Sequence, residues 1–327
     1  MPREISSLDK FLDKLRDLTG SIEVLVSLIL IVVVFSFLSP VFLSTQNLVN
    51  ILMHVSVIGI ISVGMTFVIL SAGIDLSVGS IVALSGVVSA KFMLIFSAQQ
   101  DLTAVLAVLV ALATGTFIGL INGALISKWN IPPFIVTLGM MGIARGLALL
   151  VSGGRSVYGF TSSIVFLGQG DIFGVPMPVI IFLLTVIVAH FVLFYSKFGL
   201  YTKVVGDNEM AAKTTGINIQ RQKLKVYALS GFLASISGIL YMARINAAEP
   251  MAGNMYELDA IAAVIIGGTS LFGGAGTIIG TLIGALIMGV LRNGLNLLAV
   301  SPYYQRIAIG VVVIAAVLLE KVREESE

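Results

Sequence analysis

The chain contains no cysteine, and only 11% of its 327 residues are charged. Without cysteine there is no disulfide, no thiolate nucleophile and no Cys-ligated metal. The charged fraction is about half that of soluble domains, while 57% of the residues are hydrophobic and the mean hydropathy is +1.07. These values exclude a soluble enzyme, a nucleic-acid-binding protein and a disordered scaffold. They indicate a protein that lies in a lipid bilayer.

Motifs for catalysis and metal binding are missing as well. The sequence has no G-x-x-x-x-G-K-[ST] loop to hold nucleotide phosphates, and no G-x-S-x-G or H-E-x-x-H motif. Its two histidines, His54 and His190, have no His, Asp or Glu at ligand spacing. We therefore expect a chain that is not an enzyme and that binds no metal or cofactor itself.

Long apolar runs are abundant instead. A helix needs about 20 apolar residues to cross the hydrocarbon, and it bonds its own backbone amides there. Ten such runs predict an all-α polytopic membrane protein with about ten transmembrane helices. The connections 72–75 and 272–276 are very short, which leaves open whether the third and eighth helices cross fully. The runs are residues 22–39, 49–71, 76–97, 102–127, 132–152, 177–195, 225–245, 258–272, 276–299 and 304–320.

The basic residues predict the orientation, because they collect in cytoplasmic loops. With ten spans, both termini are cytoplasmic. We expect a cytoplasmic amphipathic tail (1–21), one transmembrane domain (22–320) with a cytoplasmic loop at 196–225, and a cytoplasmic C-terminal tail (321–327). The apolar stripe of the first tail fits a helix on the membrane surface, and a short solvated helix fits as well. The cytoplasmic basic residues are Arg3, Lys10, Lys14, Arg16, Lys128, Lys197, Lys203, Lys213, Arg221, Lys223, Lys225, Lys321 and Arg323, against Arg155, Arg244 and Arg306 outside.

Glycines recur every four residues in two of the runs, which places small residues on one helix face and predicts close helix packing there. Segments 115–126 and 276–287 match at eight of twelve positions and run in opposite directions in this topology. An inverted repeat explains the match, and so does a shared packing motif. The recurring glycines are Gly115, Gly119 and Gly123 in the first run, and Gly276, Gly280 and Gly284 in the second.

Polar residues in or beside the spans have two interpretations. Asp75 and Asp259 open predicted helices, where a carboxylate caps free amides, so we expect structural roles for both. No acidic residue stands clearly in mid-membrane, as an ion-coupled transporter requires. Uncharged polar residues either line a translocation path or form interhelical hydrogen bonds. The candidates for the path are Asn50, Thr66, Asn122, Thr137, Asn293 and Asn296.

The cytoplasmic loop 196–225 is built like a docking element. Asp207 or Asn208 is placed to cap a short helix through Glu209, Ala211 and Ala212, and Gly216 supplies a positive-φ stop. The small alanines leave room for a partner. An ordinary charged loop between two spans remains the alternative.

The run Gly206-Asp207-Asn208-Glu209-Met210-Ala211-Ala212-Lys213-Thr214-Thr215-Gly216 resembles the cytoplasmic E-x-A-A-x-x-x-G motif of bacterial ABC-importer permeases. The stretches 64–66, 73–80, 256–263, 267–270 and 293–298 are similar to those of the ribose/xylose/galactose type of these permeases. The resemblance covers about residues 39 to 320. The chain lacks the Leu-Pro ending that other importer families carry in this motif.

The resemblance implies the transmembrane permease subunit of an ATP-driven, binding-protein-dependent monosaccharide importer in the bacterial plasma (inner) membrane. Its partners would be a cytoplasmic ATP-binding subunit that carries ATP and Mg, an extracytoplasmic sugar-binding protein, a second permease copy and membrane lipid, but no nucleic acid. Ribose is a first guess, and xylose, galactose and a furanosyl signal molecule stay open. The acidic loop from Glu249 to Asp259 is either a contact for the binding protein or a solvated loop. An ion-coupled secondary transporter of a small neutral solute, or a structural or receptor-type membrane protein, is the alternative.

Overall fold

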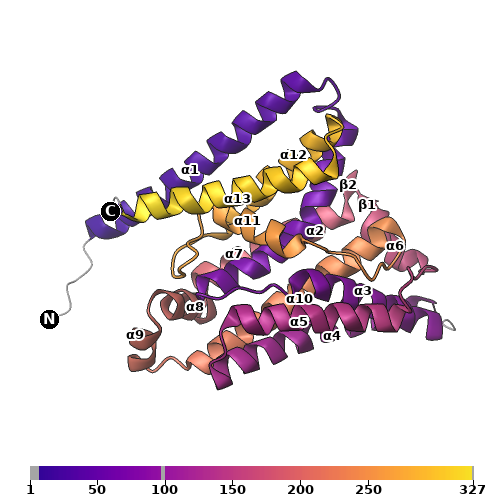
Figure 1. Ribbon diagram of the computed structural model, residues 1–327, viewed down its shortest axis with the longest axis horizontal. Helices are drawn as coiled ribbons and strands as arrows, with labels where there is room; N and C mark the ends of the chain where they lie inside the picture. The colour runs from indigo at the N-terminus through magenta and orange to yellow at the C-terminus, as the bar shows by residue number, and fades with distance from the viewer. Residues whose placement is uncertain (1–6, 97–99, 326–327) are drawn as a thin grey trace.

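The computed structural model describes residues 7–96 and 100–325, which form thirteen α-helices and one short hairpin (Figure 1). The helices are α1 (Ser7–Leu38), α2 (Thr45–Leu70), α3 (Val78–Ile95), α4 (Gln100–Trp129), α5 (Pro133–Ser152), α6 (Ser162–Gln169), α7 (Met177–Tyr195), α8 (Lys197–Asp207), α9 (Glu209–Thr214), α10 (Ile219–Ile245), α11 (Tyr256–Ile266), α12 (Ile278–Leu297) and α13 (Pro302–Glu325). The strands are β1 (Asp171–Ile172) and β2 (Val175–Pro176).

Each of the ten predicted runs contains a helix, and the chain is an all-helical, polytopic membrane protein. Seven helices in the described part are long and apolar enough to cross a membrane, and α1 adds a shorter apolar stretch, Ile22–Leu38. The sequence leaves open whether the eighth run crosses the membrane fully. Its helix, α11, has 11 residues and so reaches only about 16 Å, roughly half the hydrocarbon thickness.

Local sequence sets many of the helix ends. Ser44 and Thr277 accept hydrogen bonds from backbone amides in the first turns of α2 and α12, as capping side chains do. α5 begins at Pro133 and ends before Gly153, which has a left-handed φ of 68°. α11 ends before Gly267 and Gly268, the second of which has a φ of 80°, so the apolar run continues while the helix does not.

The segment between α5 and α7 holds structure that the hydropathy pattern did not indicate. α6 is followed by the antiparallel pair β1 and β2, joined by Phe173 and Gly174. Both joining residues have positive φ, the geometry of a tight hairpin turn. Asp171 fixes the turn, because its Oδ2 accepts a hydrogen bond from the Gly174 amide at 3.0 Å.

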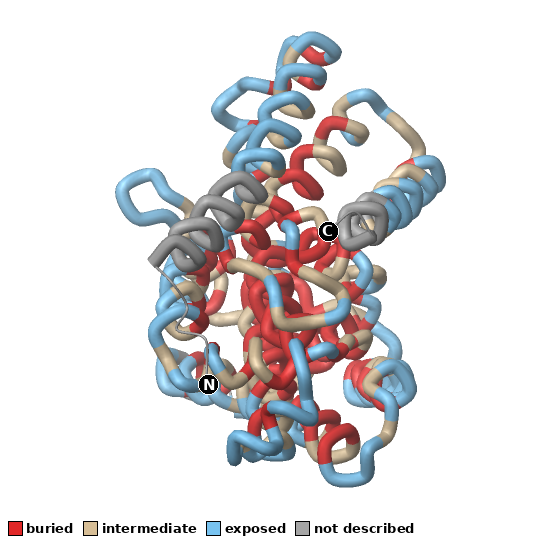
Figure 2. Tube along the Cα trace, turned by 90° about the vertical axis from the view of Figure 1, so that its left-hand side faces the viewer, coloured by how far each residue is buried: buried red, intermediate tan, exposed pale blue. Residues whose placement is uncertain are grey.

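The buried part of the molecule lies in its centre, surrounded by exposed helices (Figure 2). Of the most apolar stretch of each helix, 83% is buried in α2 and 72% in α3 and α10, but only about a third in α4, α5 and α7. The outer helices therefore turn apolar side chains such as Leu150 and Phe191 outward. In a bilayer that surface contacts lipid tails.

The two ends of the molecule differ. α8 and α9 lie at the same end as the start of α1 and the end of α13, whereas α6 and the hairpin lie at the opposite end (Figure 1). α1 runs without a break across the predicted tail boundary at residue 21. The side chains that form the apolar stripe predicted for the tail lie outside the described part of the structure. Residues 1–6 and 326–327 lie outside it as well.

Candidate functional site at the segment between α7 and α10

The predicted docking element, residues 196–225, folds into two short helices at one end of the molecule. Asn208 is the capping residue, and its Oδ1 accepts a hydrogen bond from the Ala211 amide at 2.9 Å. Asp207 is the last residue of α8 instead. A second cap, Asn218, accepts a hydrogen bond from the Arg221 amide at 2.9 Å and starts α10. Two asparagines thus bracket α9.

The C-terminal end of α9 is followed by a glycine with positive φ. Gly216 has a φ of 83°, its amide donates to the Lys213 carbonyl at 3.1 Å, and the Ile217 amide donates to the Ala212 carbonyl at 3.1 Å. This pair of bonds is the usual glycine-terminated helix end. Ala212 lies on the buried face of α9. Its small side chain therefore fits the packing of this helix within the chain itself.

The outer face of α9 is open. Met210 is 73% exposed, and Ala211, Lys213 and Thr214 are exposed too. Glu209 pairs with Lys223 of α10 at 2.6 Å, an exposed pair that contributes little stability. α9 is therefore a short helix with fixed ends and a free face, which suits a protein partner.

The end of α8 packs against two backbone turns of the membrane domain. Gly206 is buried against the carbonyl of Leu70 at the end of α2, and a Cβ there would overlap that oxygen. The Gly274 amide, between α11 and α12, donates to the same Leu70 carbonyl at 3.0 Å. Asp207 lies against Gly274. The segment that carries α9 is thus in direct contact with the membrane helices.

Asp75 lies just before α3 and is completely buried. Its Oδ1 accepts hydrogen bonds from the Ser77 amide at 3.0 Å and the Ser77 hydroxyl at 2.6 Å, and its Oδ2 accepts one from Ser230 of α10 at 2.8 Å. The Ser77 hydroxyl in turn accepts from Asn122 of α4 at 2.9 Å. The sequence suggested a simple cap, but this carboxylate joins three helices.

Asp259 also differs from the expected helix cap. It lies in the first turn of α11, where Met255 is the capping position and makes no side-chain cap bond. Its carboxylate pairs with Arg292 of α12, with oxygens 2.7 and 2.6 Å from Nη2. The pair borders a cavity of about 410 Å³ between α11, α12 and α13.

The acidic loop 249–259 does not form an acidic outer surface. Glu257 and Asp259 are buried, and Glu249 accepts a hydrogen bond from the Tyr241 hydroxyl at 3.3 Å. Arg145 of α5 holds the loop, since its Nη1 donates to the carbonyls of Pro250 and Ala252 at 2.8 and 2.7 Å. Contact of this loop with a binding protein stays a prediction, and its exposed residues, among them Met251 and Asn254, carry no charge.

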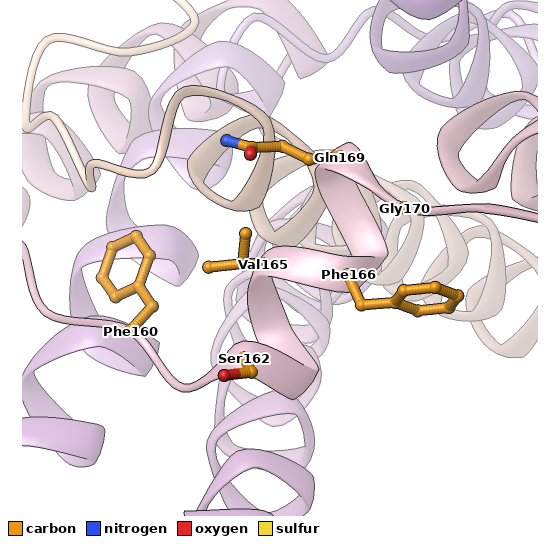
Figure 3. Close-up of a pocket in the computed structure, with 6 residues that line it drawn as sticks. All are labelled: Phe160, Ser162, Val165, Phe166, Gln169 and Gly170. Atoms are coloured by element: carbon orange, nitrogen blue, oxygen red, sulfur yellow. The ribbon is translucent and has the colours of Figure 1, made fainter.

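The opposite end of the molecule carries a shallow hollow of about 380 Å³ beside α6 (Figure 3). Its lining mixes aromatic and polar groups, and the rings of Phe160 and Phe166 point in different directions. None of its lining residues was among the predicted site residues. They are Phe160, Ser162, Val165, Phe166, Gln169 and Gly170.

Comparisons with known proteins agree on one class. The sequence pattern of the family described as "Branched-chain amino acid transport system / permease component" matches residues 47–317. The chain belongs to this family. It is 46% identical to the ribose import permease protein RbsC of Escherichia coli over 92% of this chain and 93% of that protein. It is 43% identical to RbsC of Bacillus subtilis over 90% of both chains, and 42% identical to the D-allose transport system permease protein AlsC of Escherichia coli over 90% of this chain and 89% of that one. No solved structure matches.

The resemblance to ribose-type ABC-importer permeases is therefore confirmed, and the chain is a multi-pass transmembrane permease rather than an enzyme. Within the described residues, no three His, Cys, Asp or Glu side chains gather closely enough to hold a metal ion.

The six path candidates of this permease are not gathered in one place. Thr66 of α2 bonds to Thr281 of α12 at 2.7 Å, and Asn293 exchanges two hydrogen bonds with Asn47, at 3.0 and 2.8 Å. Thr137 donates to the Ile74 carbonyl at 3.3 Å. Asn122 has its amide nitrogen bonded and its buried Oδ1 without a partner among the described residues. Asn50 and Asn296 are exposed.

The recurring glycines lie at close helix contacts. Gly115, Gly119 and Gly123 of α4 face α10, where an added Cβ would overlap the backbone of Gly231, Tyr227 and Leu224 respectively. Gly280 and Gly284 of α12 face Gly267 and Ala263, at the end of α11. Gly276, with a φ of 155°, lies against Thr269.

Proposed function

We propose that this permease imports a monosaccharide in an ATP-driven, binding-protein-dependent system, with ribose as the first substrate to test. The relatives named for ribose and allose import, each aligned over about 90% of this chain, support a sugar substrate. The neutral side chains on facing helices, such as Thr66 and Asn293, suit an uncharged polar solute. The specific sugar rests on the binding protein that delivers it.

The observation that carries the proposal is the free face of α9. A helix of six residues, closed by Asn208 and Gly216, projects at one end of the molecule with Met210 outward. This chain has no phosphate-binding loop of its own. A separate ATP-binding subunit that seats α9 and carries ATP and Mg supplies the missing energy source.

The orientation follows from that assignment. The α9 end is cytoplasmic, so both termini are cytoplasmic as well, because α1 starts and α13 ends there (Figure 1). The short α11 completes its passage with the irregular loop that precedes it, which gives ten passages across a bacterial inner membrane. The two sets of recurring glycines, on α4 and α12, are consistent with an inverted repeat.

Two further partners complete the proposed importer. The sugar-binding protein docks at the opposite end, which carries α6 and the β1–β2 hairpin. A second copy of the chain pairs with the first around a central path, so that the permease acts as a homodimer. Closure of the ATPase pair then displaces α9 and switches the path between outward-open and inward-open states.

Reconstitution with omitted components tests this proposal. Proteoliposomes contain the permease, its candidate ATPase and, on the substrate side, the binding protein with radiolabelled ribose. We expect ATP-dependent uptake only when all three proteins are present. Uptake by the permease alone would contradict the assignment and favour an ion-coupled transporter. Failure with ribose, allose and the other candidate sugars in the complete system would reject sugar import.

A further inference from the structure

The last turn of α8 meets the membrane domain through close contacts of its backbone. Gly206 lies against the Leu70 carbonyl and the Gly274 amide, and Gly273 lies against the Gly206 carbonyl. The Gly274 amide closes the contact on Leu70 at 3.0 Å. We call these four residues the glycine junction. Because no long, flexible side chain lies between the two backbones, the contact can absorb little of a displacement of α8.

The junction joins α8 to the α2–α3 turn (residues 71–77). That turn contains Asp75, whose carboxylate is bonded to Ser77 and to Ser230 of α10. The Ile74 carbonyl accepts hydrogen bonds from Tyr227 of α10 and Thr137 of α5, both at 3.3 Å. Displacement of this turn therefore reaches α5 and α10.

The junction also joins α8 to the α11–α12 turn (residues 267–277), which runs beside α8 in Figure 1. Gly273 and Gly274 have φ values of 96° and 74°, so this turn needs glycine for its backbone shape as well as for space. α11 and α12 pack at Gly267 and Gly280, and the Asp259–Arg292 pair joins them again. Displacement of this turn therefore moves both α11 and α12.

From these contacts we infer that the glycine junction is the point at which motion of α9 enters the membrane domain. One helix end bears on two turns, and the two turns control α3 on one side and α11 with α12 on the other. Gly206, Gly273 and Gly274 are positioning residues in this account. The inference rests on the proposed function and names how its ATPase partner acts on the helices.

Alanine substitutions with matched controls test it. Gly274→Ala and Gly268→Ala place a methyl group in the same turn at φ values of 74° and 80°, so their backbone strain is alike. Only Gly274 has neighbours within 4 Å, and these belong to Asp207. Likewise Gly206→Ala intrudes on Leu70, whereas Gly310→Ala, also in a helix, meets nothing within 4 Å.

The readout is ATP hydrolysed per ribose taken up, in proteoliposomes with the ATPase and binding protein. We expect the two junction variants to keep the ATPase subunit bound and to raise this ratio at least about tenfold. The two controls should stay within about twofold of the unsubstituted protein. Equal ratios in junction and control variants would overturn the inference. Absence of ATP-driven uptake by the unsubstituted protein would instead reject the proposed function.

A cysteine pair provides a second measurement that survives if Gly206→Ala fails to fold. The natural chain has no cysteine, so Asp207→Cys with Gly274→Cys forms the only thiol pair, at positions whose Cβ atoms are adjacent. If the junction moves as one body, the oxidised protein should couple hydrolysis to uptake and the reduced protein should lose that coupling. Uptake in the reduced form that oxidation blocks would show a sliding contact and overturn the inference.

Discussion

Arg292 Nη2 donates to both carboxylate oxygens of Asp259, at 2.7 and 2.6 Å, and so joins α12 to the short helix α11. The Asp259 side chain is 2% exposed and the Arg292 side chain 26%. Because α11 is too short to cross the membrane alone, the contact with α12 fixes its depth and direction. The pair is therefore a structural tie between the two helices.

Removing one partner of that pair should be costly. Asp259→Ala leaves the guanidinium without its carboxylate, and we expect a loss of about 3 kcal/mol of stability. The change is measured as a lower thermal unfolding midpoint in detergent. The double variant Asp259→Asn with Arg292→Gln should recover at least about 1 kcal/mol, and the same midpoint for the single and double variants would contradict the tie.

Asp75 should tolerate replacement of its carboxyl group poorly, because that group is buried and bonded to Ser77 and Ser230. Asp75→Asn turns one acceptor into a donor that faces the hydroxyl or amide donors of Ser77 and Ser230, so we expect a loss of about 1–3 kcal/mol. Ser230→Ala removes one bond only and should cost about 1 kcal/mol. The unfolding midpoints of the two variants provide the comparison, and a smaller effect for Asp75→Asn would count against the network.

Hydropathy and turn residues predicted much of this fold but not its long-range ties. The ten apolar runs each contain a helix, because apolar length and internal backbone bonding are local properties. The run 258–272 extends beyond its helix, because the apolar sequence continues through Gly267 and Gly268 while the backbone at these glycines ends α11. The sequence did not predict α8, because this helix mixes apolar and charged residues and has no long apolar run.

The same limit applies to the site. The ends of α9 at Asn208 and Gly216 could be predicted, because capping depends on neighbouring residues. The partners of Asp75 and Asp259 could not, because Ser230 lies 155 residues from Asp75 and Arg292 lies 33 residues from Asp259. The packing of Gly206 on Leu70 likewise depends on how distant segments meet.

The exposed face of α9 should determine ATPase association. Met210→Arg adds a charge at a side chain that is 73% exposed and leaves the buried Ala212 untouched. We expect co-purification of the ATPase to fall at least about tenfold. Phe173→Arg, at the fully exposed hairpin tip on the opposite end, is the matched control and should bind the ATPase normally. Equal binding by both variants would contradict docking at α9.

The α4–α10 contact should reject even one methyl group. At Gly119 a Cβ would overlap the Tyr227 carbonyl, whereas at Gly310 it meets nothing within 4 Å. We expect Gly119→Ala to cost about 1–3 kcal/mol. Gly310→Ala should have little effect or stabilise its helix by about 0.5 kcal/mol. Thermal unfolding in detergent measures both, and an unchanged midpoint for Gly119→Ala would show that the helices separate easily.

The most direct test of the central claim is ribose uptake into membrane vesicles that contain this permease, its candidate ATPase and the binding protein, measured with vanadate and with an ionophore. Vanadate blocks the ATPase, and the ionophore collapses ion gradients. The account predicts uptake that vanadate abolishes and the ionophore leaves intact. Uptake that resists vanadate and disappears with the ionophore would contradict it, because the energy would then come from an ion gradient and not from ATP.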